Sequence, residues 1–307
     1  MSSINLNAII VIYNKKIEEC PTYIGVEHIL SETKAEHIHK VYIFDNSTDK
    51  DIREHNQQFI NAQQLDVIKY ITLFNNVGLA KAYNTVLKMI SEDNSTRFDL
   101  SSKWLLILDQ DTELTKEYIE AFYNEYQNNS KIGSYVPRIY GKHHIISPLK
   151  VNRKYFGDSF DMADQEPSGL LTQRFSAINS CSIINVGVLK ELNGFNENFP
   201  IDYLDYYTYY AMWKKGYLVY CLDVDINHDL SFDTFGEVGF GRYKIFLNSQ
   251  SEYVYEVEKN SKKMILLASF HNYRRHALRT LRNRRLIFFV KGSLISAKNV
   301  IRIINKK

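Results

Sequence analysis

The 307-residue sequence has no apolar run of about 18 residues, the length that a helix needs to cross a bilayer. Its start, MSSINLNAII, lacks a basic segment before the apolar run, so we expect no signal peptide. Cysteine is scarce, with three residues far apart in the chain and no CxxC pair: Cys20, Cys181 and Cys221. An odd, sparse set argues against a zinc site and favours a reducing compartment.

Two glycine-rich phosphate-binding motifs are also missing. No GxGxxG follows the first apolar run, and the chain contains no GxxxxGKS or GxxxxGKT. These motifs bring backbone N–H groups close to phosphates in dinucleotide-dependent dehydrogenases and in P-loop nucleotide hydrolases. Both classes are therefore disfavoured.

Acidic residues are absent from the last part of the chain. Residues 271–307 contain 11 of the 38 Lys and Arg residues, and the last acidic residue is Glu258. The first 270 residues thus hold 27 basic against 35 acidic side chains, a net charge of −8, under an overall charge of +3. An acidic body with a basic tail predicts a polyanionic partner for the tail.

The most informative stretch that is present is WLLILDQDTEL at 104–114. Five apolar residues without polar alternation predict a strand buried on both faces. Asp109 and Asp111 follow at the end where open α/β sheets bind ligands, and two such carboxylates repel each other unless a cation lies between them. The alternative is that both aspartates open the next helix, capped by Thr112 or Thr115. An EF-hand loop is rejected because Leu114 stands where its turn needs glycine.

Strands and helices alternate through the first 114 residues. We predict strands at 7–13, 41–44, 67–74 and 104–108, and helices at 23–39, 51–64 and 79–90. This order predicts an α/β fold with a doubly wound, mostly parallel sheet covered by helices on both faces. The polar segments after the four strands should gather at one edge as a single binding crevice: 13–14, 45–47, 75–78 and 109–111.

Four of these segments, in order, carry a family resemblance: IIVIYN, IFDNSTD, NNVGLAKAYN and WLLILDQDTEL. Together they resemble the nucleotide-sugar-binding half of family 2 glycosyltransferases, which have the GT-A fold. The motif LDQDT most resembles that of the branch that includes bacterial rhamnosyltransferases. The resemblance covers about residues 5–230.

The resemblance implies roles for several residues of the first half. Asp45 would contact the donor nucleobase, Asp109 would lie near the ribose, and Asp111 would bind Mg²⁺ or Mn²⁺ on the diphosphate. Gly78 and Ala82 would let the backbone and a helix approach the nucleotide. The full set of implied donor-binding residues is Tyr13, Asp45, Gly78, Ala82, Asn84 and Asp109.

The second half supplies the acceptor side of the resemblance. We predict strands at 175–185 and 217–226, a helix at 206–215 and a polar loop at 157–169. The segment IDYLD resembles the family motif that precedes this helix, which implies that Asp205 is the general base and that Asp202 belongs to the site. The alternative is that either aspartate caps the helix. By position, His228 would be a third metal ligand.

Tyrosines replace the commoner charged pattern of the family in the helix at 206–215. Tyr207 and Tyr210 either stack on a sugar or belong to the core.

In the tail, from Lys262 onward, apolar residues alternate with basic residues at helical spacing, which predicts basic amphipathic helices. Such helices bind anionic membrane surfaces, so residues 260–307 are expected to dock the protein on the inner face of the cell membrane. The alternative is a helical hairpin packed on the core or on a second subunit of a homodimer. Nucleic acid is disfavoured because aromatic residues are not interleaved as stacking platforms.

These observations lead to one functional expectation with stated alternatives. Residues 1–235 would form a GT-A catalytic domain, with a donor half at 1–115 and an acceptor half at 130–235, followed by a helical region at 236–307. The enzyme would be a cytoplasmic, peripheral, inverting glycosyltransferase that moves L-rhamnose from dTDP-rhamnose to a bacterial surface glycan or lipid-linked glycan. The alternatives are a UDP-galactofuranose or other UDP-hexose donor, and a non-catalytic nucleotide- or glycan-binding protein. A nucleotidyltransferase is disfavoured because no glycine-rich basic loop follows the first strand.

Overall fold

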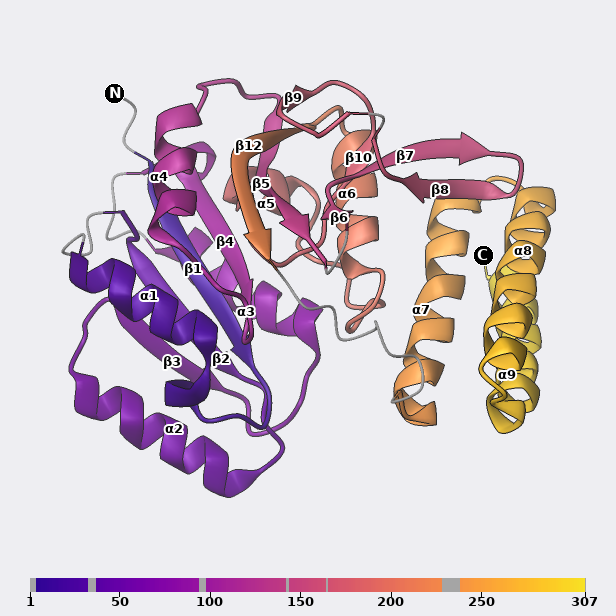
Figure 1. The fold of residues 1–307 in the computed structure, drawn as a ribbon, viewed down its shortest axis with the longest axis horizontal. Helices are drawn as coiled ribbons and strands as arrows, with labels where there is room; N and C mark the ends of the chain where they lie inside the picture. The colour runs from indigo at the N-terminus through magenta and orange to yellow at the C-terminus, as the bar shows by residue number, and fades with distance from the viewer. Residues whose placement is uncertain are drawn as a thin grey trace.

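A central sheet with helices on both faces forms the body of the protein, and three long helices stand at one side of it (Figure 1). The structure is a computed structural model. It describes residues 4–32, 37–93, 98–141, 144–163, 165–227 and 238–306. The predicted α/β class with a mostly parallel sheet in its first half is confirmed.

The first half of the chain builds the parallel part of the sheet. The strand order β3-β2-β1-β4 places the first strand at the centre, with parallel partners on both sides. The predicted strands and helices are present with shifted ends, and the first helix is shorter than predicted because residues 37–39 are not helical. The strands are β1 (Asn5–Ile12), β2 (Lys40–Asp45), β3 (Ile68–Thr72) and β4 (Lys103–Asp109). The helices are α1 (Pro21–Glu32), α2 (Lys50–Gln63), α3 (Leu79–Glu92) and α4 (Lys116–Glu125), with short 3-10 turns η1 (Ile17–Glu19) and η2 (Leu100–Ser102).

Two hydrophobic cores lie on the two faces of the sheet. Alternate residues of β1 point to opposite faces, so Ala8 and Ile10 join one core while Ile9 and Val11 join the other. Helices α1, α2 and α4 cover the first face. Helix α3 covers the second, together with α5 (Val186–Glu191) and α6 (Leu204–Lys214). Burial on both faces explains why β1 and β4 read as continuous apolar runs.

The second half extends the sheet with mixed strand directions, in the order β4-β11-β5-β12-β9, with β6 on β5. The predicted single strand at 175–185 is wrong, because β10 ends at Ser176 and β11 begins only at Ser182. The residues between them include a turn in which Cys181 has a φ of 58°. The strands of this part are β5 (Ile132–Tyr140), β6 (Ile145–Ser147), β9 (Gly169–Leu171), β11 (Ser182–Asn185) and β12 (Leu218–Asn227), whereas β10 (Phe175–Ser176) belongs to a second sheet.

A small second sheet corrects the predicted loop at 157–169. Residues Gly157–Asp161 form β8, which pairs with β7 (Leu149–Lys154), and β10 completes three strands. Ion pairs explain how so polar a hairpin is held. Asp158 accepts from Arg174 at 2.7 Å, and Asp161 accepts from Lys154 at 2.8 Å. The stabilising partners come from outside the strand itself, so the strand's own composition did not indicate it.

Three helices follow the sheet: α7 (Phe240–Glu258), α8 (Lys262–Arg282) and α9 (Leu286–Asn305). Helix α7 lies between the body and the α8–α9 hairpin (Figure 1). The hairpin packs on α7 through two small apolar clusters that contain Leu247 and Phe288 in one, and Ile265 and Ile303 in the other. In the described part of the chain, none of the helices combines the length and the apolar character that a membrane crossing requires.

All three cysteines are buried and unpaired with one another. Burial raises the pKa of Cys20 to about 11 and that of Cys221 to about 12, and it raises the pKa of Cys181 as well. Cys181 is completely buried in the core beneath the sheet, where it has a packing role.

Candidate active site

The four polar loops predicted to form one crevice are joined to one another by hydrogen bonds. The Tyr13 N–H donates to Gln110 Oε1 at 2.9 Å, which links the loop after β1 to the loop after β4. The Asn14 N–H donates to Ser47 Oγ at 2.8 Å, which links β1 to β2. The Val77 N–H donates to Asn46 Oδ1 at 3.1 Å, which links β2 to β3. The carboxyl ends of four neighbouring parallel strands thus present one continuous edge.

Asp45 organises this edge from inside. Its side chain is fully buried at the end of β2, with one oxygen accepting from the Ser47 N–H at 2.9 Å. The other oxygen accepts from Asn56 Nδ2 and from the Tyr70 hydroxyl, each at 2.8 Å. A buried carboxylate needs such donors, and here they fix the loop that carries Ser47. Contact of Asp45 with a nucleobase stays a prediction.

The turn after β4 is held by a threonine from α1. The Thr22 hydroxyl accepts from the Thr112 N–H at 2.8 Å and donates to the carbonyls of Asp109 and Thr112. Thr112 in turn exchanges a 2.8 Å hydrogen bond with Ser180. Both threonines are completely buried, so the backbone of the turn is fixed while Asp111 extends into solvent.

Asp109 and Asp111 have the chemistry of a divalent-metal site. Both are carboxylates with accessible surface, and hard oxygen ligands suit Mg²⁺ and Mn²⁺. Among the residues that the structure describes, no third His, Cys, Asp or Glu joins them in a cluster. Two carboxylates fit an ion that takes its remaining ligands from substrate phosphates. His228, the predicted third ligand, lies outside the described residues.

Gly78 allows the acceptor half to meet the donor edge. Its φ is 81°, and a Cβ at this position would lie 2.9 Å from the Pro200 carbonyl oxygen. That carbonyl accepts from the N–H of Leu79, the first residue of α3, at 2.7 Å. Only glycine combines this conformation with so close an approach. Pro200 therefore brings the following segment, with Asp202 and Asp205, to the crevice.

Two other predicted donor residues have structural contacts in this arrangement. Asn84 donates to the Phe195 carbonyl at 2.8 Å and accepts from the Phe195 N–H at 2.7 Å, so it fastens α3 to the acceptor half. Ala82 is completely buried in the core beneath the crevice. Their contact with a nucleotide stays a prediction.

Asp205 has the electrostatic environment of a base. It lies in the first turn of α6, where its Oδ1 accepts from the Tyr206 N–H at 2.8 Å. Burial raises its pKa to about 7, against the lowering effect of that N–H, and the negative charges of Asp202 and Asp109 raise it further. The influence of Asp109 means that the two halves of the predicted site meet here.

Asp202 is paired with a residue that the sequence did not single out. Arg242 of α7 donates to both Asp202 oxygens, from Nη2 at 2.7 Å and from Nη1 at a shorter distance. The bidentate contact ties the segment before α6 to the helical region, across 40 positions of sequence. No local pattern indicated Arg242, because its partner lies in another part of the chain.

Tyr83 is a second residue that sequence reasoning missed. It is completely buried in α3, and its hydroxyl has no hydrogen-bond partner in the described part of the chain. Burial raises its pKa well above the ordinary value, and the charges of Asp109 and Asp205 act in the same direction. Tyr83 therefore lies beneath the meeting point of the donor and acceptor carboxylates.

The tyrosines of α6 differ in their surroundings. Tyr207 is half-buried and stacks on Phe199 with a centroid distance of 4.9 Å. Tyr210 is also half-buried and lies under the Arg174 guanidinium at 5.0 Å. Both contacts are with the protein itself, as the core alternative expected.

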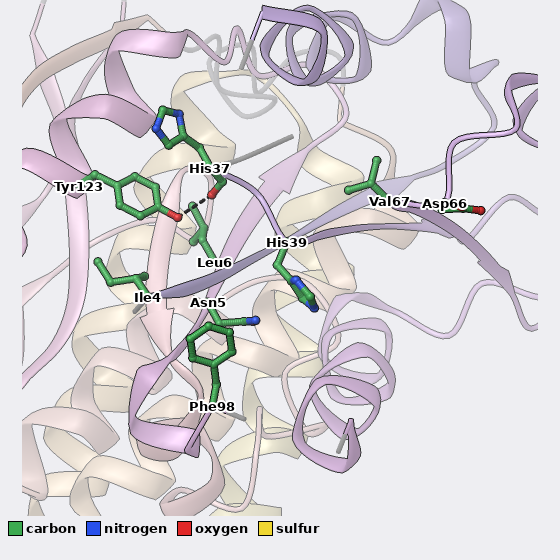
Figure 2. A pocket seen from close by; sticks show the side chains of 9 residues that line it. All are labelled: Ile4, Asn5, Leu6, His37, His39, Asp66, Val67, Phe98 and Tyr123. Atoms are coloured by element: carbon green, nitrogen blue, oxygen red, sulfur yellow. Dashed lines mark hydrogen bonds between the residues drawn. The ribbon is translucent and has the colours of Figure 1, made fainter. Parts of the chain in front are cut away.

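A cavity of about 410 Å³ at the opposite edge of the sheet is separate from this site. Figure 2 shows its lining residues around the beginnings of β1 and β2, where the Tyr123 hydroxyl donates to the His37 carbonyl at 2.6 Å. Ligands of α/β sheets bind beyond the carboxyl ends of the strands, and this cavity lies at the amino ends.

The comparisons with known proteins agree with the architecture. Residues 8–192 match the model of a family described as Glycosyl transferase family 2. No curated protein matches the chain. Among solved structures, the fold is similar to that of GalNAc-T7 in complex with UDP, GalNAc and Mn²⁺, with a TM-score of 0.55 and 12% identity.

The coverage of these structures is unequal. The match to GalNAc-T7 covers 83% of this chain but 51% of that one, so the chain spans about half the length of that protein. A mannosyltransferase from Pyrobaculum calidifontis, in complex with GDP-Man and Mn²⁺, gives a TM-score of 0.48 at 10% identity. That match covers 98% of this chain and 86% of the other.

Proposed function

The chain belongs to glycosyl transferase family 2, and from that premise we propose that it transfers a sugar from a nucleotide-sugar donor to an acceptor hydroxyl with inversion. The observation that carries the proposal is the carboxyl of Asp205, whose pKa is raised to about 7 at the junction of the two halves. A base with a pKa near the working pH combines ionisation with proton affinity.

The reaction follows from this placement. The Asp205 carboxylate takes the proton of the acceptor hydroxyl, and the oxygen of that hydroxyl attacks the anomeric carbon of the donor. The bond from that carbon to the diphosphate breaks on the opposite side, so the configuration inverts and a nucleoside diphosphate leaves. Asp111 would hold a divalent cation, Mg²⁺ or Mn²⁺, with Asp109 beside it near the ribose. When bound, the cation neutralises the negative charge of the leaving diphosphate.

The proposed donor is dTDP-rhamnose, with UDP-galactofuranose or another UDP-hexose as the alternative. This choice rests on the motifs LDQDT at 108–112 and IDYLD at 201–205. The proposed acceptor is a bacterial surface glycan or its lipid-linked precursor. The UDP and Mn²⁺ bound to the similar structure of GalNAc-T7 support a nucleotide-sugar donor with a divalent cation here.

We also propose that the α8–α9 hairpin contacts the anionic inner face of a membrane. One apolar stripe of each helix packs inside the helical region, and a second stripe is exposed at helical spacing. In α9, Ile287 and Leu294 are 67% and 60% exposed. In α8, Leu266 and Phe270 are 51% and 62% exposed. Exposed apolar side chains among 11 basic residues suit the interface of an anionic bilayer.

Nucleotide binding tests the proposed function. Thermal unfolding of the full chain is measured with dTDP, UDP, GDP and ADP, each with and without Mn²⁺. A ligand at about 100 times its dissociation constant stabilises the folded state by roughly 2.7 kcal/mol. We expect a Mn²⁺-dependent rise in melting temperature with dTDP or UDP, and sugar release from the matching nucleotide sugar. No response to any nucleotide would overturn the proposal.

A further inference from the structure

A cavity of about 780 Å³ lies beside the proposed base and has no role in the donor site. Its walls come from the β7–β8 hairpin, the beginning of α6, and helices α7 and α8. The hairpin reaches from the body of the protein over the ends of these helices (Figure 1). The volume falls in the range of small-molecule sites, about 300 to 1,000 Å³.

The cavity adjoins Asp205 through the residue that follows it. Tyr206 lines the cavity with its side chain, while its backbone N–H donates to the Asp205 carboxylate at 2.8 Å. Burial raises the pKa of the Tyr206 phenol, the charge of Asp205 raises it further, and the charge of Arg275 lowers it. One phenol thus lies in the fields of both the base and an arginine of α8.

Aromatic rings form one wall of the cavity. Phe160 of β8 packs on Tyr206 with a centroid distance of 4.2 Å, and Tyr203 packs on Tyr253 at 5.4 Å. The Tyr203 hydroxyl accepts from Gln250 at 2.8 Å. Such faces with fixed hydroxyls suit a sugar ring, which offers C–H groups on its faces and hydroxyls at its rim.

The acidic residues of the cavity wall already have cationic partners. Asp158 is paired with Arg174 at 2.7 Å, Asp161 with Lys154 at 2.8 Å, and Glu258 with Arg153, whose Nη2 lies 2.5 Å from Oε2. These carboxylates therefore leave little negative charge to repel an anion.

Arg275, an arginine of α8 that lines the cavity, differs from the acidic residues of the cavity in its ion pairing. No carboxylate of the described residues lies within 4 Å of the Arg275 guanidinium, and Arg279 lines the cavity one helical turn further on. Burial lowers the pKa of His271 and His276, so both imidazoles are neutral near pH 7. The cavity thus combines an aromatic wall, a tyrosine next to the proposed base in the chain, and a guanidinium that has no carboxylate partner among the described residues.

We propose that this cavity is the acceptor site and that it selects an acceptor bearing a phosphate group, which Arg275 binds while the aromatic wall holds the sugar. The inference rests on the proposed function and adds the chemical class of its acceptor. A guanidinium matches phosphate oxygens with two parallel N–H donors, which a lysine ammonium cannot do. The phosphate belongs either to a soluble sugar phosphate or to a lipid carrier.

Binding to the full chain tests the proposal without turnover. Glucose 1-phosphate and geranyl phosphate are titrated beside their neutral counterparts, methyl glucoside and geraniol, in EDTA so that no metal recruits phosphate to the donor crevice. We expect at least one anionic probe to bind at least tenfold more tightly than its neutral counterpart. Preference for the first probe identifies a sugar phosphate, and preference for the second identifies a lipid phosphate.

Variants of α8 assign the effect to one side chain. Arg275→Ala should remove the tenfold preference, and Arg275→Lys should restore it only in part. Arg274→Ala is the matched control, because Arg274 is exposed on the same helix but does not line the cavity. Equal binding of charged and neutral probes by the unmodified protein, or equal effects of the two alanine variants, would overturn the inference.

Donor binding is measured in the same samples to separate the two proposals. If dTDP or UDP with Mn²⁺ still raises the melting temperature while the phosphate preference is absent, the inference fails and the proposed function stands. If no nucleotide binds, the proposed function fails, and the probe titrations still decide whether the cavity binds phosphate.

Discussion

At the scale of single residues, the proposed reaction depends on Asp205. Its raised pKa favours proton transfer but lowers the stability of the folded protein. The carboxylate is a stronger base than an ordinary aspartate at the pH where it is still ionised. The same burial makes the charged form unfavourable in the folded state, so the residue lowers stability at neutral pH.

Asp205→Asn should lower the transfer rate by roughly 100- to 10,000-fold, because the amide takes no proton. Nucleotide binding should survive. For the unmodified enzyme, kcat/KM should fall tenfold per pH unit below about 7 and level off above it. Turnover close to that of the unmodified enzyme in the variant would remove Asp205 from its role as the base.

The stability of the same variant has a predicted pH dependence. The ordinary pKa of 3.8 is raised to about 7 on folding, so the cost of the charge is absent below pH 4 and grows as the pH rises to 7. Asp205→Asn should therefore be more stable than the unmodified protein at pH 8 and equal to it at pH 4, in urea titrations.

Arg242 acts on this base through Asp202. Arg242→Gln leaves the Asp202 carboxylate without its cation, and the added negative field should raise the pKa of Asp205. The acid limb of the kcat/KM profile should then move to higher pH, while Arg242→Lys keeps the charge and should move it less. An unchanged profile in Arg242→Gln would contradict the coupling.

At the scale of helices and strands, the sequence predicted the parallel half of the fold well, for a physical reason. Strands buried on both faces must be apolar throughout, and helices between them show a 3.6-residue period. The polar hairpin β7–β8 was missed because ion pairs with other segments, such as Asp158 with Arg174, stabilise it.

The predicted site residues Asp109, Asp202 and Asp205 do lie together, but Arg242 and Tyr83 reach them through tertiary contacts alone.

The packing of α8 on α9 leads to a prediction about Gly292. A Cβ at Gly292 would lie 2.3 Å from Cε1 of the His276 ring, which is buried and hydrogen-bonded to the Tyr243 hydroxyl at 2.8 Å. Gly292→Ala should therefore cost about 1 to 3 kcal/mol of unfolding free energy through overpacking, despite the helix preference of alanine.

The matched control is Gly241→Ala in α7, where nothing lies within 4 Å of the added Cβ. This change should leave stability unaltered or raise it by up to about 1 kcal/mol. Urea titration of both variants gives the comparison. If Gly292→Ala is as stable as Gly241→Ala, the close contact between the two helices is not present in solution.

At the scale of the whole molecule, charge and exposed apolar surface are both concentrated in the C-terminal helices. Full-length protein should float with vesicles that contain an anionic phospholipid and stay behind with neutral vesicles. Each basic residue near the surface contributes roughly 1 kcal/mol, and the binding should weaken as salt is added.

Ile287→Asp should reduce this binding, because it puts a charge on the exposed stripe of α9. Ile24→Asp makes the same change on α1, at an isoleucine that is 52% exposed, and serves as the control. Absence of flotation by the unmodified protein, or equal loss in the two variants, would contradict membrane contact through the tail.

The three buried thiols make the folded protein almost inert to alkylating reagents. Thiolates carry out that reaction, and burial keeps Cys20, Cys181 and Cys221 protonated and inaccessible at neutral pH. The extent of labelling of the unmodified protein therefore measures only the fraction of molecules that have unfolded, locally or globally. A single cysteine introduced on the surface of α8 or α9 would be the one fast-reacting thiol, and its dye would report vesicle contact directly.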